Sequence, residues 1–112
     1  MDYPPDATFY VRLSLVLPKE GADEQISAMQ DDLLQFFATQ PGYVRGYKLV
    51  RKYPDPRIGR ISVWQSESDA DNAASAQHVL SVRSELLRLI EAEPQIERSY
   101  TAYDPQLAPA AP

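Results

Sequence analysis

The feature that most constrains the fold is the stretch from residue 60 to residue 93, where a strand pattern runs directly into a helical one. Residues 58–65 are rich in β-branched and aromatic side chains, which is typical of a strand, and include Trp64. Ser66 then offers a hydroxyl that can cap a helix, and Asp69 and Asp71 place negative charge where the helix dipole favours it. The chain therefore combines strands and helices that follow one another with short connections.

The first half of the chain also shows strand patterns followed by a helical pattern. Residues 8–17 alternate apolar and polar side chains, which predicts a strand that ends at Pro18. Residues 22–39 carry apolar side chains at helical spacing, and Pro41-Gly42 is expected to stop that helix. A second strand is predicted over residues 43–53 and a third over residues 58–65, joined by the turn Pro54-Asp55-Pro56.

A helical region over residues 66–92, closed by Pro94, and a fourth strand over residues 96–103 complete the pattern. The order β-α-β-β-α-β predicts an α+β fold of the ferredoxin-like type. In it, a four-stranded antiparallel sheet has the first and third strands at its centre and its helices on one face. Residues 1–7 are expected to form a flexible arm, residues 8–103 the domain, and residues 104–112 a Pro/Ala-rich tail.

The second helical region carries two apolar stripes that do not align. Its early small residues include Ala70 and Ala74, and its later apolar residues include Val79, Val82 and Leu86. At 100° per residue the two stripes differ by roughly more than a quarter turn, so one straight helix would expose one of them. We therefore expect a break near residues 78–81 that divides the region into two helices.

Charge and composition exclude several classes of function. The net charge of −5 disfavours binding to nucleic acid and to anionic membrane surfaces. No apolar run approaches the ~20 residues that span a bilayer, and the N-terminus lacks a signal-peptide pattern. The absence of cysteine excludes thiol chemistry, and the carboxylates show no metal-ligand spacing, so no metal is expected. A cytoplasmic protein is the resulting expectation.

The strands carry apolar side chains on both faces, which predicts a homodimer. Ile61 and Val63 point to one side of the third strand and Trp64 points to the other. Helices on one face of a sheet cover only one of these sets. A second copy of the same sheet, related by a two-fold axis, is the simplest cover for the other set.

Three short motifs in this order resemble the dimeric α/β-barrel superfamily, and within it the antibiotic-biosynthesis-monooxygenase-like domains. They are Pro41-Gly42-Tyr43 after the first helix, the run Val63 to Glu67 at the end of the third strand, and His78-Val79-Leu80-Ser81 in the helical region. The resemblance covers residues 8–103. It implies that two sheets pack face to face as a barrel and that each subunit has a ligand pocket between its sheet and its helices.

The resemblance also bears on activity. Quinone-forming members of this group oxidise polyphenols without metal or flavin, and they share Trp64. Arg60 and Ala70 stand where those members carry Asn and Tyr. The positions that haem-degrading members need fall near Ala73 and Arg83, so haem degradation is not expected.

Four residues are the candidates for a site. Trp64 can line a pocket for a planar ligand or fill the core, and His78 can act as a general base or as a structural hydrogen-bonding group. Arg60 should share a strand face with Trp64 and can hold an anionic oxygen or form a salt bridge. Tyr47 lies on the neighbouring strand and can reach the same pocket.

Two functions follow as hypotheses. The first is a cofactor-independent monooxygenase that acts on a small phenolic or enolic metabolite, with Trp64, Arg60 and Tyr47 binding the substrate. His78 or solvent would take its proton. The second is a homodimer that binds a small ligand or a protein without catalysis. A cavity that contains Trp64 and His78 favours the first hypothesis, and a filled core there favours the second.

Overall fold

The structure, a computed structural model, describes residues 8–92 and 94–105. The predicted arm at residues 1–7 and most of the predicted tail lie outside the described residues. The elements follow the predicted order, with the second helical region divided in two, and are β1 (Thr8–Val16), α1 (Asp23–Phe37), β2 (Tyr43–Arg51), β3 (Arg57–Trp64), α2 (Glu67–Ala74), α3 (Gln77–Leu86) and β4 (Ile96–Tyr103).

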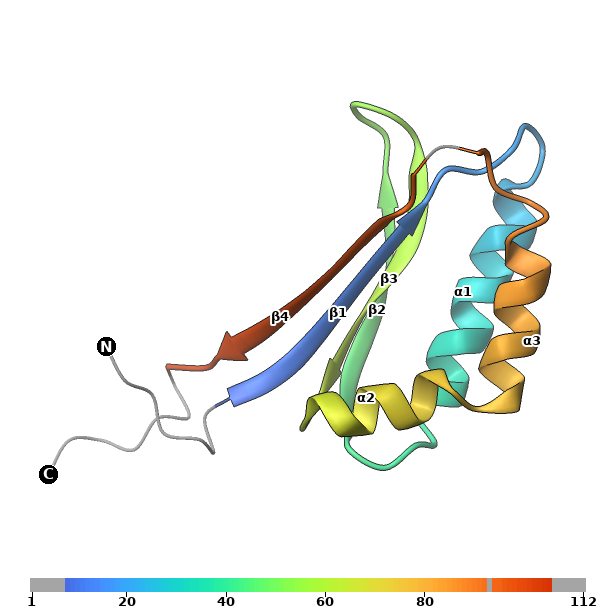
Figure 1. Cartoon of the computed structure of the whole chain (residues 1–112). Coiled ribbons are helices and arrows are strands. Elements are labelled where there is room, and N and C mark those ends of the chain that lie inside the picture. Colours follow the sequence, from blue (N-terminus) through green and yellow to red (C-terminus); the bar gives the residue numbers. More distant parts are fainter. Residues whose placement is uncertain (1–7, 93, 106–112) are drawn as a thin grey trace, which may run out of the picture.

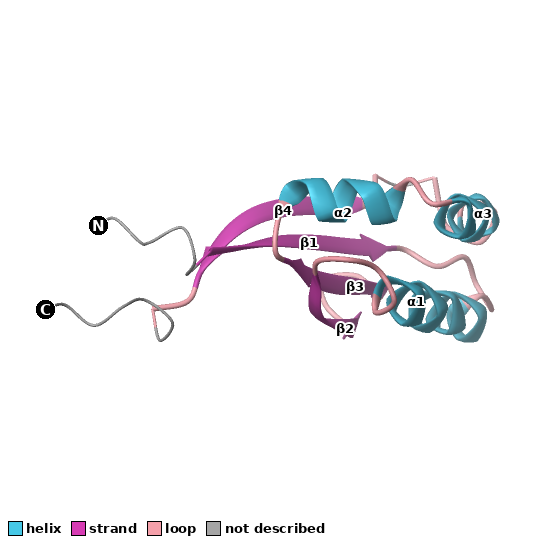
Figure 2. Ribbon diagram, turned by 90° about the horizontal axis from the view of Figure 1, so that it is seen from below, coloured by secondary structure: helices cyan, strands magenta, loops and turns pink. Residues whose placement is uncertain are grey.

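The four strands form one antiparallel sheet in the order β2-β3-β1-β4, so β1 and β3 are central as predicted. Figure 1 shows α1 and α3 side by side on one side of this sheet and no helix on its other side, and Figure 2 shows the four strands stacked in this order with α1 and α3 beside them. The ferredoxin-like α+β fold is therefore confirmed. No helix within the described residues is long and apolar enough to cross a membrane.

The start of α2 follows the predicted capping chemistry. Ser66 has an extended backbone, and its hydroxyl oxygen accepts a hydrogen bond from the backbone N–H of Asp69 at 3.1 Å. The Ser66 hydroxyl in turn donates to the Asp69 carboxylate at 2.9 Å. This pair satisfies a backbone donor that the first turn would otherwise leave free, so the helix begins directly after β3.

The predicted break in the second helical region is confirmed, but its predicted position is wrong by a few residues. It lies at Ser75 and Ala76, where Ala76 adopts an extended backbone with ψ 144°. The Ser75 hydroxyl donates to the carbonyl oxygen of Asp71 at 2.9 Å, a local bond that competes with helix continuation. The break lets α2 bury Ala70 and Ala73 while α3 buries Val79 and Leu86.

The expected end of this region near Ala92 is also wrong. α3 ends at Leu86, and the chain then makes tight turns before Ile90 forms an antiparallel bridge with Pro18. The backbone N–H of Glu91 donates to the carbonyl oxygen of Leu17 at 2.8 Å. Pairing with the chain beyond β1, together with burial of Ile90, ends the helix well before Pro94.

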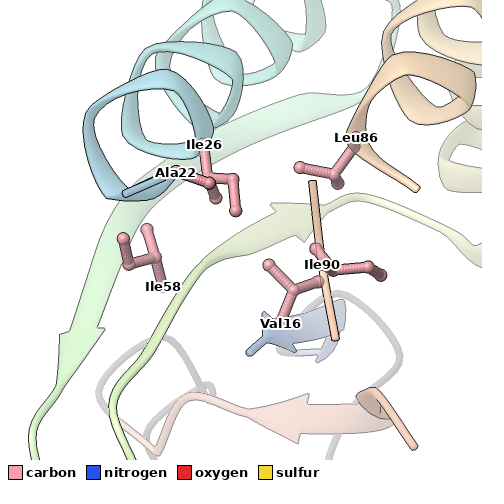
Figure 3. Packing of buried hydrophobic residues seen from close by; sticks show 6 residues of the cluster. All are labelled: Val16, Ala22, Ile26, Ile58, Leu86 and Ile90. Atoms are coloured by element: carbon pink, nitrogen blue, oxygen red, sulfur yellow. The ribbon is translucent and has the colours of Figure 1, made fainter. Parts of the chain in front are cut away.

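The apolar core consists of two clusters at opposite ends of the layer between sheet and helices. The first, shown in Figure 3, contains Val16, Ala22, Ile26, Ile58, Leu86 and Ile90. The second contains Leu33, Phe37, Trp64, Ala70, Ala73 and Val79. Between them the helix-facing positions of β1 and β3 are polar: Arg12 and Ser14 on β1, and Arg60 and Ser62 on β3. We call these four residues the polar layer.

Gly59 marks a close approach between the two central strands. A Cβ atom at this position would lie 1.8 Å from the carbonyl oxygen of Ser14 and 2.8 Å from the Cα atom of Leu15. Both are backbone atoms of the paired strand, so neither can rotate away. Only glycine fits there without moving β1 and β3 apart.

Gly59→Ala should therefore lower the free energy of unfolding by about 1–3 kcal/mol or more, because overpacking forces a backbone shift. Denaturant unfolding followed by circular dichroism measures this. Thr101→Ala, at an exposed position of β4, is the matched control and should change stability by less than about 0.5 kcal/mol. Equal stabilities of the two variants would contradict the close approach.

Candidate functional site

A cavity of about 410 Å³ lies between the sheet and the helices, at the polar layer. Its volume is within the range of small-molecule sites, roughly 300–1,000 Å³. The sheet supplies charged and hydroxyl groups and the helices supply mostly apolar ones. The lining residues are Arg12, Ser14, Phe37, Arg60, Ser62, Trp64, Ala70, Ala74, Val79, Arg83, Glu97, Arg98 and Ser99.

Trp64 forms part of the inner wall and is almost fully buried, with 1% of its surface exposed. Its Nε1–H donates to the hydroxyl oxygen of Ser62 at 2.9 Å. Phe37 and Tyr43 meet its ring edge to face, with centroid separations of 5.4 and 5.6 Å. These contacts fix the indole and leave it an apolar wall rather than a free hydrogen-bond donor.

Arg60 reaches the cavity from β3. Its Nη1 donates to the Oε1 atom of Gln30 at 2.9 Å, and its guanidinium lies 5.7 Å from the centre of the Phe37 ring. No carboxylate of the described residues forms an ion pair with it. Burial, with a smaller contribution from repulsion by Arg83, lowers the pKa of Arg60 to about 10, although Glu97 acts in the opposite direction.

The other arginines near the cavity that point toward the helices are paired. Arg12 forms an ion pair with Asp71 of α2. Arg83 of α3 lies 3.8 Å from Glu97 of β4, and both side chains are about half exposed. This half-exposed pair lies in the cavity wall, whereas Arg60 is more deeply buried.

Gln30 is a part of the site that sequence reasoning missed. It lies on α1 between Ile26 and Leu33, is fully buried, and its Nε2 atom has no hydrogen-bond partner among the described residues. Leaving a buried amide donor unpaired costs about 1–3 kcal/mol. The signal in the sequence is a glutamine at the core-facing spacing of an otherwise apolar helix stripe.

The structure brings two of the four predicted site residues together. Trp64 and Arg60 both line the cavity, as their shared strand face predicts. Tyr47 does not reach it, because Tyr47 pairs with Ile61 on the helix-free side of the sheet and is 55% exposed. A β-bulge between Tyr43 and Arg45 places Tyr43 against Trp64 and turns the following odd-numbered residues to the other side.

His78 also lies outside the cavity lining. Its Nε2 atom is 2.9 Å from the Oδ2 atom of Asp32, and its ring stacks on Phe36 with 4.7 Å between centroids. Asp32 and Phe36 belong to α1, so His78 joins α3 to α1, and the His78 and Asp32 side chains are nearly half exposed. Among the described residues, no group of three or more His, Asp or Glu side chains is placed to hold a metal ion.

Comparison with known proteins supports the fold. The sequence matches no protein-family model and no curated protein. The structure resembles a protein named "putative antibiotic biosynthesis monooxygenase" from Nitrosomonas europaea, with a TM-score of 0.79 at 18% identity, covering 94% of this chain and 98% of that chain. It also resembles a protein from Shewanella oneidensis, with a TM-score of 0.76 at 18% identity, covering 90% and 97%.

SnoaB, a cofactor-independent oxygenase from Streptomyces nogalater, aligns with a TM-score of 0.60 at 23% identity over 92% of this chain and 96% of that chain.

His78→Ala should leave ligand binding in the cavity unchanged, because the imidazole bonds to α1 rather than facing the cavity. Its cost should be a loss of stability below about 1 kcal/mol, as expected for an exposed pair. Quenching of the single Trp64 fluorophore by an added phenol, measured at pH 7 and pH 10, tests this. A loss of binding at pH 7 that disappears at pH 10, where a typical phenol is ionised, would instead assign proton transfer to His78.

By its topology and its structural neighbours, the chain has a ferredoxin-like fold, which it shares with the protein named "putative antibiotic biosynthesis monooxygenase" and with SnoaB.

Proposed function

We propose that the cavity binds a small phenolic or enolic metabolite as its anion and that the protein is a cofactor-independent monooxygenase. The observation that carries this proposal is Arg60, a largely desolvated guanidinium with no carboxylate partner among the described residues, beside the aromatic wall of Trp64 and Phe37. A flat ring fits the wall, and an ionised oxygen compensates the charge.

Binding next to Arg60 favours ionisation of the substrate. A positive charge within a few ångströms lowers the pKa of a hydroxyl or an acidic C–H group, especially where water is excluded. The sequence suggested His78 or solvent as the proton acceptor. Because His78 lies outside the cavity, we propose that the proton leaves to solvent near Arg83 and Glu97.

Molecular oxygen supplies the oxidising power. The substrate anion gives one electron to O₂, and the resulting carbon radical and superoxide couple to form a carbon–peroxide bond. The peroxide takes up one proton to become a hydroperoxide. Loss of the second proton from the same carbon then breaks the O–O bond, so a carbonyl forms and hydroxide leaves. After protonation of the hydroxide, one CH₂ group and one O₂ have become one carbonyl and one water, with the electrons supplied by the substrate.

The neighbour SnoaB supports this proposal, since it is named a cofactor-independent oxygenase. The cytoplasm is the proposed location, as the acidic, cysteine-free sequence predicts. The side chains do not require a resident cofactor in this scheme, because the anion itself is the reductant of O₂.

A second candidate is binding without catalysis. The observation that favours it is the chemistry of the cavity wall: among the described residues that line it there is no histidine or tyrosine, and the carboxylate of Glu97 lies near Arg83. Such a cavity can hold an anion without a side chain dedicated to proton transfer. Oxygen uptake separates the two candidates.

The test uses an oxygen electrode with a panel of anthrones and polyphenols. Substrate-dependent oxygen uptake is expected, and Arg60→Leu should reduce its rate by about 10²–10³-fold, as for loss of an oxyanion-stabilising group. Arg60→Lys should lie between. Arg88→Leu is the matched control, because Arg88 is 76% exposed beyond α3, and it should retain full activity.

Absence of uptake with every compound, together with saturable quenching of Trp64, would support the non-catalytic candidate instead.

We also propose that a second copy of the chain covers the helix-free face. That face carries apolar side chains on all four strands, including Phe9, Val11, Leu13, Leu15, Tyr47, Leu49, Ile61, Val63 and Tyr100. Tyr47 and Tyr100 are more than half exposed in the single chain. A two-fold axis would pack this face against itself and remove it from water.

Light scattering should therefore give about twice the monomer mass of 12.6 kDa. Ile61→Glu, which places a charge at the centre of this face, should shift the protein to monomer because an unpaired charge is costly to bury. Circular dichroism checks that the variant is folded. A wild-type monomer at micromolar concentration would contradict the proposed dimer.

A further inference from the structure

Gln30 is the feature of the cavity region that packing does not explain. It is fully buried on α1 at a position whose helical neighbours Ile26, Leu33 and Phe37 are all core residues. Its Nε2 atom lacks a hydrogen-bond partner among the described residues, which an aliphatic side chain would avoid. Because the unpaired amide lowers the stability of the fold, core packing does not explain a glutamine at this position.

Within the described part of the chain, the side chain of Gln30 makes one hydrogen bond, and it goes to Arg60. The amide oxygen accepts from Nη1 at 2.9 Å and so anchors one corner of the guanidinium. This contact also settles which end of the amide faces Arg60, because the NH₂ group could not accept the bond. The partner that holds Arg60 in place is therefore neutral.

A carboxylate in the same place would give a different site. Glutamate has nearly the shape of glutamine, and a buried arginine is usually compensated by such a charge. Of the carboxylates near the cavity, Asp71 pairs with Arg12, and Glu97 lies near Arg83 and attracts Arg60 without forming an ion pair with it. The neutral amide thus fixes the position of Arg60 without cancelling its charge.

We infer that Gln30 is the positioning residue that sets the charge preference of the cavity: it holds the Arg60 guanidinium toward the ligand and leaves its positive charge for a planar oxyanion on a flat ring. This inference rests on the proposed function in that the ligand occupies the same cavity. It adds that selection of the anion over its neutral form depends on a residue that lies outside the cavity lining.

The test measures the preference directly with 4-nitrophenol, whose anion and acid absorb at different wavelengths and interconvert near neutral pH. The wild-type protein should bind the anion more tightly and so lower the pKa of the bound phenol. Gln30→Glu should weaken binding of the anion at least about tenfold and leave binding of the neutral form within about twofold, because only the anion meets the added charge.

Gln30→Met is the matched control, since it removes the hydrogen bond without adding charge. It should still lower the pKa of the bound phenol, by a smaller amount, because Arg60 keeps its charge but loses its anchor. Benzoate and benzamide, measured by calorimetry, are a second pair of ligands. They have similar shapes, but benzoate is an anion and benzamide is neutral. Gln30→Glu should lose affinity for benzoate and keep that for benzamide.

Three results would overturn the inference. One is a wild-type protein with no preference for the anion, and another is a Gln30→Glu variant that keeps the full preference. The third is an equal loss of affinity for charged and neutral ligands, which is the signature of a purely structural role. If Gln30→Glu does not fold, Gln30→Met decides the matter. A pKa of bound 4-nitrophenol in Gln30→Met that equals the value in the wild-type complex would overturn the inference.

These measurements of binding are independent of turnover. Absence of oxygen uptake would overturn the proposed monooxygenase and leave the charge preference intact. Loss of the charge preference with oxygen uptake retained would overturn the role of Gln30 alone.

Discussion

The hydrogen bond between Arg60 and Gln30 crosses the space between sheet and helix at the point where the apolar core is interrupted. On either side of it lies a complete apolar cluster, and each cluster combines residues of the sheet with residues of the helices. The two clusters hold the layers together at their ends. The middle of the domain can therefore carry a cavity and a charge without the sheet and helices separating.

This division of the core can be followed along each element. On β3 the helix-facing residues run Ile58, Arg60, Ser62 and Trp64, so the apolar ones stand at the ends. β1 pairs with them in the same order, with Val16 and Tyr10 at the ends. Each strand thus places its polar residues opposite those of the other, and the cavity is a consequence of register.

The sequence was sufficient to predict the fold because each element has its own signal. Alternation predicts β1, β-branched and aromatic residues predict β3, proline and glycine mark the ends of elements, and helical spacing predicts α1. The positions that failed depend on tertiary pairing. The antiparallel bridge between Pro18 and Ile90 ends α3 early, and no local sequence pattern between Leu86 and Pro94 predicts that contact.

The site could be predicted only in part, for similar reasons. Trp64 and Arg60 are on one strand, where a period of two decides which side chains share a face. Tyr47 is on another strand, and its orientation relative to Trp64 depends on a bulge at the start of β2 that strict alternation does not reveal. Predicting the orientation of the His78 side chain requires the exact position of the helix break, which the apolar stripes locate only to within a few residues.

Gln30 shows where stability and function oppose each other in this fold. An aliphatic residue there would join the two apolar clusters along α1 and would leave no buried donor unpaired. It would also leave Arg60 without its anchor, in a region where burial already disfavours the charged form. The polar side chain therefore lowers stability but fixes the position of Arg60, which is what the proposed anion site requires.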